Sequence, residues 1–255
     1  MEEKSISELL RAKAHVWNHT LKFINSMSLK CAVELGIPDI IHSHGQPMTL
    51  SQLVMALQIN PSRASNVRRL MRILVHSGFF TLQKLVGDEE GYALTEASRL
   101  LLKDSPFNES SFVLMILDHV VLKPWELVST WLKNDAVGTF TTPFDVAHGE
   151  TVWNFAAHEP RFNVLFNEAM ASDGPLVSCV LRTKCREVFE GLSSLVDVGG
   201  GTGNLAKSLA ETFPNLKCTV LDLPHVVAVT CKAATTCIIL EGTCLSQFLL
   251  QKQFY

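Results

Sequence analysis

The sequence predicts an α/β protein with two parts. A mostly helical N-terminal domain of the winged-helix type precedes the first part of a doubly wound, Rossmann-like domain. Two observations carry this prediction. The first hundred residues read as three amphipathic helices followed by a hairpin. Further along, LVDVGGGTG at 195–203 places a glycine loop directly after an apolar run, as in a strand–loop–helix unit.

Composition limits the classes of function. The chain has 255 residues, of which 47% are hydrophobic and 18% charged, so it is long enough for one large or two ordinary globular domains. Its net charge is -3, which provides no electrostatic footprint for nucleic acid or an anionic membrane. The acidic start MEEKSISELL lacks the pattern of a secretory signal, and no window is apolar enough to span a bilayer.

Cysteine usage indicates a reducing, cytoplasmic location. The seven cysteines are odd in number and form no CxxC pair. Cys231, Cys237 and Cys244 lie close together in the sequence, but no histidine follows at ligand spacing. We therefore predict buried or incidental thiols and no metal site.

The predicted N-terminal elements follow in order. Apolar residues at helical spacing run from residue 5 to Gly36. Pro38 lies just beyond, and a glycine followed by a proline is a usual signal for the end of a helix. Thr49 or Ser51 can cap a short second helix that ends near Leu57. A third helix follows INPSRAS and ends at Gly78, and residues 79–101 then predict two short strands around a GDEEG turn.

A winged helix raises the alternative of DNA binding. The third helix carries a modest basic cluster, Arg63, Arg68, Arg69 and Arg72. However, the predicted wing contains the acidic run 88–90, which would repel a phosphate backbone. A structural or dimer-forming role is therefore favoured over DNA binding.

From about residue 105 to 190 the pattern is helical again, with many bulky aromatic residues. Aromatic residues at this density are typical of a core, although any one of them could instead line a substrate pocket. Residues 193–227 then read as one βαβ unit: the strand Leu195 to Val198, the GGGTG loop, the helix NLAKSLAETF, and the strand CTVLDL ending at Asp222.

Two kinds of ligand fit such a glycine loop. Gly201, Gly203 and Ala206 match the dinucleotide fingerprint, and Asp222 lies at the usual distance for its acidic partner. Asp197, however, lies at the start of the loop and would repel a pyrophosphate, whereas it attracts a cation. S-adenosylmethionine carries an ammonium and a sulfonium and has no phosphate, so these residues favour it.

The sequence LVDVGGGTGNLAKSLAETFPNLKCTVLDLPHVV closely resembles the plant S-adenosylmethionine-dependent O-methyltransferases of the caffeic acid, flavonoid and isoflavone type. AVELGIPDII, PSRASNVRRLMRILVHSGFF and YALTEASRLL extend the resemblance through the N-terminal region, and HEPRFNVLFNEAMASD extends it through the middle. The segment HGETVWNFAAHEPRFNVLFNEAM is most similar to the isoflavone and related flavonoid branch.

The resemblance implies a winged-helix domain at residues 1–104 that forms a homodimer, and an O-methyltransferase domain at 105–255. It implies that S-adenosyl-L-methionine transfers its methyl group to a phenolic hydroxyl, with no nucleic-acid or membrane partner. By the same resemblance, Gly199, Gly200, Gly201 and Gly203 line the methionine part of the donor. Asp222 would accept the two ribose hydroxyls, as its place at a strand end also predicts, and Met170 and Phe166 would contact the acceptor ring.

The sequence departs from the family pattern in an atypical tail, residues 228–255. The family's GGDMF segment and its WxxHDW-like catalytic histidine segment are not present. Reading the codons from Cys231 through Leu249 one nucleotide out of step can spell QGSNNLHYIGGDMFESIP, which is family-like. We therefore hypothesise a frame displacement or truncation near residue 230.

Three expectations follow from this departure. We assign no catalytic residue, because no histidine of the sequence is an evident replacement for the general base. We expect no sheet strand after the second, and hence exposed apolar helix faces and poor solubility. We also keep a second function open, in which an inactive chain dimerises with a full-length O-methyltransferase and regulates it.

Overall fold

The protein is represented by a computed structural model that describes residues 3–87, 89–133, 142–226 and 237–241. The chain divides into two compact units, 1–105 and 106–255, and each is described by itself. Within the described ranges, no helix is both long enough and apolar enough to cross a membrane.

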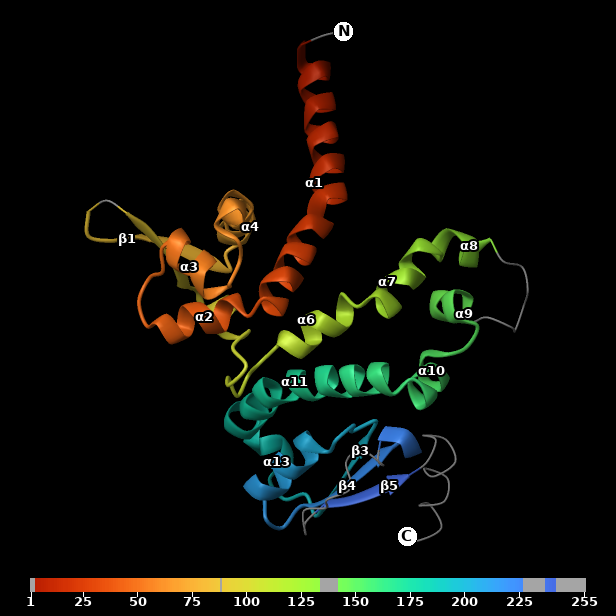
Figure 1. Cartoon of the computed structure of the whole chain (residues 1–255). Helices are drawn as coiled ribbons and strands as arrows, with labels where there is room; N and C mark the ends of the chain where they lie inside the picture. Colours follow the sequence, from red (N-terminus) through yellow and green to blue (C-terminus); the bar gives the residue numbers. More distant parts are fainter. Residues whose placement is uncertain (1–2, 88, 134–141, 227–236, 242–255) are drawn as a thin grey trace. The chain divides into compact units, whose positions relative to one another are not determined.

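The first unit consists of helices and one antiparallel hairpin (Figure 1). Its elements are α1 (Glu3–Glu34), α2 (Ile37–His44), α3 (Leu50–Ala56), a short 3₁₀ turn (Pro61–Arg63), α4 (Ala64–His76), β1 (Phe80–Lys84), β2 (Glu90–Leu94) and α5 (Glu96–Arg99). Thr49 caps α3 and Thr95 caps α5, each through a reciprocal capping box. Leu53, Met71, Leu74 and Phe80 are among the side chains of the buried core that joins these elements.

Helix α2 corrects the predicted element order. Gly36 and Pro38 end the first helix as expected, but they also begin a helix that the sequence reading missed. Gly36 is left-handed at the N-cap, and Pro38 occupies the first turn of α2, where its missing N–H costs nothing. Among the described residues, four α-helices therefore precede the hairpin, not three.

Much of the apolar surface of α1 is exposed. Leu10, Trp17 and Phe23 are 62%, 59% and 62% exposed, and several further apolar residues between Ile6 and Met27 are also exposed. A helix this apolar is ordinarily buried against another surface.

The second unit begins with helices and ends in a parallel sheet. Its elements are α6 (Ser110–Ile116), α7 (His119–Glu126), α8 (Val128–Leu132), α9 (Pro143–His148), α10 (Val152–His158), α11 (Pro160–Lys184), α12 (Arg186–Phe189), β3 (Ser194–Val198), α13 (Asn204–Thr212), β4 (Lys217–Asp222) and β5 (Cys237–Glu241). Helix α11 packs against α6 and against α13, and α13 packs against β4 (Figure 1). This packing places the middle of the chain beside the glycine loop.

The sheet has the order β3-β4-β5, and both pairs of neighbouring strands are parallel. The predicted βαβ unit is thus observed within one or two residues of its expected bounds. Cys218 and Val220 of β4 are buried with Leu209 and Ala206 of α13. Val196 and Val198 of β3, in contrast, are each 44% exposed.

Strand β5 overturns the expectation that the sheet has no strand after the second. Residues 237–241 read CIILE, a run in which β-branched and apolar residues predominate, and this composition favours an extended conformation. Pairing with β4 places β4 in the centre of the described sheet. The rest of the atypical tail, including Cys231 and Cys244, lies outside the described residues.

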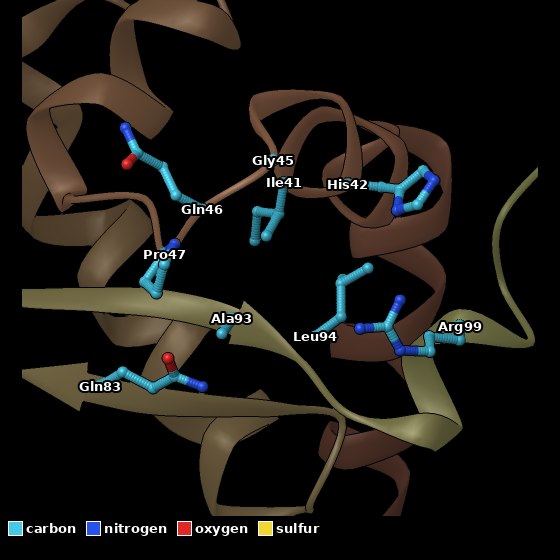
Figure 2. Close-up of a pocket in the computed structure, with 9 residues that line it drawn as sticks. All are labelled: Ile41, His42, Gly45, Gln46, Pro47, Gln83, Ala93, Leu94 and Arg99. Carbon is cyan, nitrogen blue, oxygen red and sulfur yellow. The ribbon is translucent and has the colours of Figure 1, made fainter.

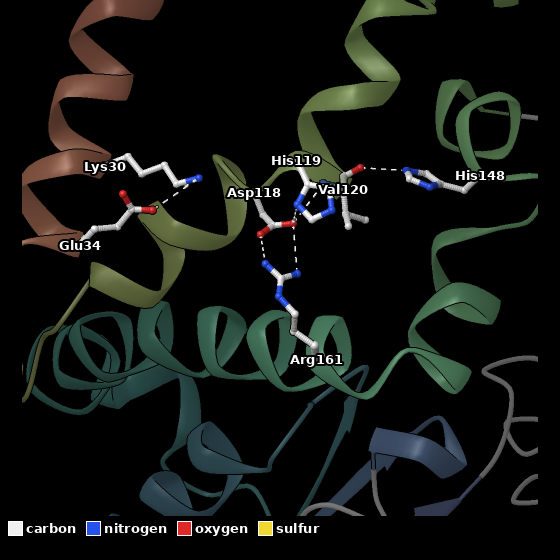
Figure 3. Close-up of polar contacts among 7 residues, drawn as sticks. All are labelled: Lys30, Glu34, Asp118, His119, Val120, His148 and Arg161. Carbon is white, nitrogen blue, oxygen red and sulfur yellow. Dashed lines mark hydrogen bonds and ion pairs between the residues drawn. The ribbon is translucent and has the colours of Figure 1, made fainter.

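An ion pair joins the helices of the second unit. The buried Asp118 caps α7 by accepting the Val120 N–H and pairs with Arg161 of α11 (Figure 3). Burial alone would raise the pKa of Asp118, but the hydrogen bond and charge of Arg161, the Val120 N–H and the nearby His119 together lower the pKa below its usual value. The Asp118 carboxylate therefore stays ionised and has a structural role, linking α7 to α11.

Candidate functional site

The glycine loop connects β3 to α13. The backbone of Gly203, at the N-cap of α13, has the left-handed conformation, which residues other than glycine rarely adopt. A Cβ at Gly200 would lie 2.7 Å from the Asp197 carboxyl carbon and 2.9 Å from Val220 Cγ1. Gly199 and Gly201 instead adjoin open space, with no atom within 4 Å of an added Cβ. The loop is thus packed on its sheet side and open on the other.

A cavity of about 240 Å³ lies against this open side. Gly199, Gly200 and Gly201 line it from the loop, together with Asp197, Thr202, Asn204 and Leu205. Helix α11 supplies the facing wall with Asn167, Met170, Ala171, Gly174 and Val177. Small-molecule sites usually have about 300–1,000 Å³, so this cavity accommodates one end of a donor-sized ligand.

The facing wall shows which predicted residues the fold brings together. Met170, predicted from the resemblance, lines the same cavity as three of the predicted glycines, and its side chain is 42% exposed. Phe166 does not line the cavity; its ring lies edge-on to Trp153, with centroids 5.9 Å apart, in an aromatic cluster with Phe162. The roles of both residues toward an acceptor stay predictions.

Sequence reasoning missed Asn167, Ala171 and Gly174. Their signal was the helical spacing of the four residues Asn167, Met170, Ala171 and Gly174, because residues at i, i+3, i+4 and i+7 share one helix face. Gly174 and Ala171 are small, which leaves room between the helix and the loop.

Asp222 lies beside the loop but does not line the cavity. Its Oδ2 accepts the Gly201 N–H at 2.6 Å, and its Oδ1 accepts the Leu223 N–H at 2.7 Å. A carboxylate has about four acceptor positions, so these two bonds leave capacity for a diol. Its predicted contact with ribose hydroxyls stays a prediction.

Asp197 and Asp222 give this end of the sheet negative charge. Burial raises the pKa of Asp197, and the charge of Asp222 raises it further. Two carboxylates that destabilise each other are stabilised by a cation. The arrangement fits a ligand with an ammonium and a sulfonium better than one with a pyrophosphate.

The pKa shift predicts how Asp197→Asn changes stability. Since the folded-state pKa is raised, ionised Asp197 costs stability at neutral pH, and this cost vanishes as the pH falls below about 4, the ordinary value for Asp. The variant should therefore melt a few degrees higher than the parent at pH 7, with the difference lost near pH 3.5. Thermal unfolding across this pH range measures it, with exposed Glu211→Gln on α13 as control; a lower melting temperature at pH 7 would contradict the prediction.

No histidine is among the residues that line this cavity. His148 Nε2 contacts the Val120 carbonyl at 3.0 Å (Figure 3), and His158 Nε2 contacts Glu150 at 2.7 Å. Within the described residues, no group of three or more His, Cys, Asp or Glu side chains could hold a metal ion.

Two of the further cavities in the described part of the first unit have arginine side chains on their linings. One, of about 360 Å³, lies between the end of α2 and the hairpin, with Arg99 on its lining (Figure 2). Arg99 is paired with Glu96 at 3.5 Å. The other, of about 790 Å³, has a mixed lining in which Arg68 and Arg72 lie with Glu89 and Glu90. Neither cavity contains a predicted site residue, and the second presents no uniformly basic surface.

Together, these observations define a Rossmann-like domain with a cavity beside its glycine loop, in a chain that also has a mostly helical N-terminal unit. The family models identify it further: the O-methyltransferase dimerisation domain matches residues 17–104, and the O-methyltransferase domain matches residues 125–240. The chain belongs to the O-methyltransferase family.

Curated relatives support this assignment. "Probable O-methyltransferase 3" of Humulus lupulus is 55% identical over 234 residues, which cover 89% of this chain and 61% of the relative. Trans-resveratrol di-O-methyltransferase of Vitis vinifera is 56% identical over 224 residues, covering 87% and 62%. The 8-hydroxyquercetin 8-O-methyltransferase of Mentha piperita is 53% identical over 232 residues, covering 88% and 62%. The chain thus spans about three fifths of the length of these relatives.

Solved structures share the fold. Human N-acetylserotonin methyltransferase, in complex with S-adenosylmethionine, superposes with a TM-score of 0.73 at 20% identity, covering 91% of this chain and 66% of that one. Mitomycin 7-O-methyltransferase superposes with a TM-score of 0.68 at 27% identity, covering 93% and 68%.

Proposed function

We propose that this chain binds S-adenosyl-L-methionine and carries the donor site of an O-methyltransferase that acts on a phenolic hydroxyl of a flavonoid or isoflavonoid. One observation carries the proposal: a single cavity brings Met170 together with the glycine loop and Asp197. The names of the relatives, among them a trans-resveratrol and an 8-hydroxyquercetin methyltransferase, support a phenolic acceptor.

The residues of the site would act by position and charge. S-Adenosyl-L-methionine supplies a methyl group activated by a sulfonium. The loop N–H groups and the two carboxylates hold the polar and cationic parts of that ligand. Met170 provides a polarizable surface for an aromatic acceptor ring beside it. Deprotonation of the acceptor needs a base, and we assign none among these residues, so we propose that the chain alone is inactive in methyl transfer.

Calorimetric titration of the purified chain with S-adenosylmethionine tests the donor site. Binding in the micromolar range is expected, and no heat across that range would contradict the proposal. A radiolabelled methyl-transfer assay with a panel of flavonoids and isoflavonoids tests the proposed inactivity of the chain alone. Transfer by the chain alone at a rate typical of enzymes would overturn the proposed inactivity.

We further propose a homodimer formed through the first unit, in the cytoplasm. The exposed apolar residues of α1 and the match to a dimerisation domain support this assembly. Light scattering after gel filtration should give a molar mass twice the 28.2 kDa of the single chain. A monomer at micromolar concentration would contradict it.

The same α1 surface favours a second candidate function. An inactive chain could pair with a full-length O-methyltransferase and alter its activity through a shared dimer. Co-purification with such a relative, followed by titration of its activity, would support this role, and no association would remove it.

A further inference from the structure

Asn167 is a buried polar side chain on the wall that faces the glycine loop. It is 9% exposed and lines the cavity from α11. Within the described part of the chain, its side chain makes one hydrogen bond, in which Nδ2 donates to Asn163 Oδ1 at 3.0 Å. An amide group has two donor hydrogens and a carbonyl oxygen, so one N–H and the oxygen keep capacity for a ligand.

Burying an amide with only part of its hydrogen bonds made costs free energy, unless a ligand makes the remaining ones. Buried polar groups are almost always hydrogen-bonded, because desolvation without a partner is unfavourable. Asn163, one helical turn earlier on α11, fixes one hydrogen of the Asn167 amide and thereby limits its rotation. One N–H and the carbonyl oxygen of the Asn167 amide therefore keep capacity for a ligand in the cavity that this residue lines.

The backbone of α11 offers a complementary acceptor on the same face. Pro175 lies inside the helix and has no N–H, so the Ala171 carbonyl lacks its usual donor four residues on. Ala171 also lines the cavity, one turn after Asn167. Helix α11 thus has, on two residues that line the cavity, a side-chain donor and a main-chain carbonyl without its usual helical donor, one turn apart.

A ligand that uses both groups has an anion and a cation close together. The amino-acid end of S-adenosylmethionine carries an α-carboxylate and an α-ammonium on one carbon. We propose that Asn167 donates a hydrogen bond to the α-carboxylate of the methyl donor, and that the Ala171 carbonyl accepts one from its α-ammonium. This assignment rests on the proposed function and extends it to α11, so that the donor is held between this helix and the glycine loop.

The test compares two ligands that differ in the carboxylate. S-Adenosylmethionine has it, whereas decarboxylated S-adenosylmethionine keeps the sulfonium and an amine but lacks it. Asn167→Ala should weaken calorimetric binding of S-adenosylmethionine about 10–100-fold, the usual effect of losing a hydrogen bond to a charged group. It should leave binding of the decarboxylated ligand within about 2-fold of the parent, which also shows that the variant is folded.

Asn167→Asp nearly preserves side-chain volume and should change the affinities for the two ligands in opposite directions. The introduced carboxylate should weaken binding of S-adenosylmethionine more than alanine does, and should strengthen binding of the decarboxylated cation. The matched control is Glu168→Ala, the adjacent and exposed residue on α11 that does not line the cavity; it should change neither affinity.

The outcomes separate this inference from the proposed function. If the parent chain binds neither ligand, the proposed donor site is wrong and the inference falls with it. If the parent binds S-adenosylmethionine but Asn167→Ala binds it equally well, the role of Asn167 alone is overturned. Equal losses for both ligands in both Asn167 variants would likewise overturn it, since the carboxylate would then make no difference.

Discussion

Gly200→Ala is expected to abolish most donor binding and to destabilise the second unit. The added methyl would lie 2.7 Å from the Asp197 carboxyl group and 2.9 Å from Val220 Cγ1, distances that force one of these neighbours to move. Val220 is fully buried in the sheet core, so it has little freedom to do so. Overpacking of this kind costs about 1–3 kcal/mol.

The effect on binding should be of the same size as the effect on folding. Relief of the clash displaces either Asp197 or the loop, and both line the cavity. A loss of about 10–100-fold in affinity for S-adenosylmethionine corresponds to that strain. Gly174→Ala is the control for stability, because its added methyl meets nothing within 4 Å and α11 should gain helix propensity. Unchanged affinity and melting temperature in Gly200→Ala would contradict the loop geometry.

Asp222→Ala should have the second large effect, because Asp222 connects β4 to the loop. Its removal leaves the N–H groups of Gly201 and Leu223 without their acceptor. Hydrogen bonds to a charged group contribute about 1.5–3 kcal/mol, so the unfolding free energy should fall by about 2–3 kcal/mol. Donor affinity should fall about 100-fold as the loop loses its fixed position.

A thermodynamic cycle that combines one change in the ligand with one change in the protein separates the predicted ribose contact of Asp222 from its contact with the loop. S-Adenosylhomocysteine and its 2′-deoxy analogue are titrated into the parent chain and into Asp222→Asn, which keeps one acceptor oxygen. If Asp222 binds the ribose hydroxyl, the losses from the two changes are not additive. Additive losses would limit Asp222 to holding the loop.

The sequence predicted the strand–loop–helix unit around the glycine loop well, because that information is local. An apolar run, a glycine loop and a helix with apolar periodicity are adjacent in the chain, and β3, α13 and β4 follow them closely. The bounds of α3 were also predictable, since the Thr49 cap marks the helix start. Pro38 was misread because proline is compatible both with the end of one helix and with the first turn of the next.

The facing wall could not be predicted with the same certainty. Asn167 is more than thirty residues from the loop in the sequence, and its face of α11 is defined only after the helix has packed beside α13. Strand β5 was missed for a different reason. The tail does not match the family pattern, whereas the β-forming composition of residues 237–241 is sufficient for pairing with β4.

The pair Asp197 and Asp222 also affects how the site distinguishes the methyl donor from its demethylated form. S-Adenosylmethionine carries a positive sulfur, whereas S-adenosylhomocysteine has a neutral thioether. Carboxylates that stabilise the first ligand by charge therefore hold the second less strongly. On the proposed function, the chain would bind the methyl donor more tightly than the demethylated cofactor, even though it transfers no methyl group.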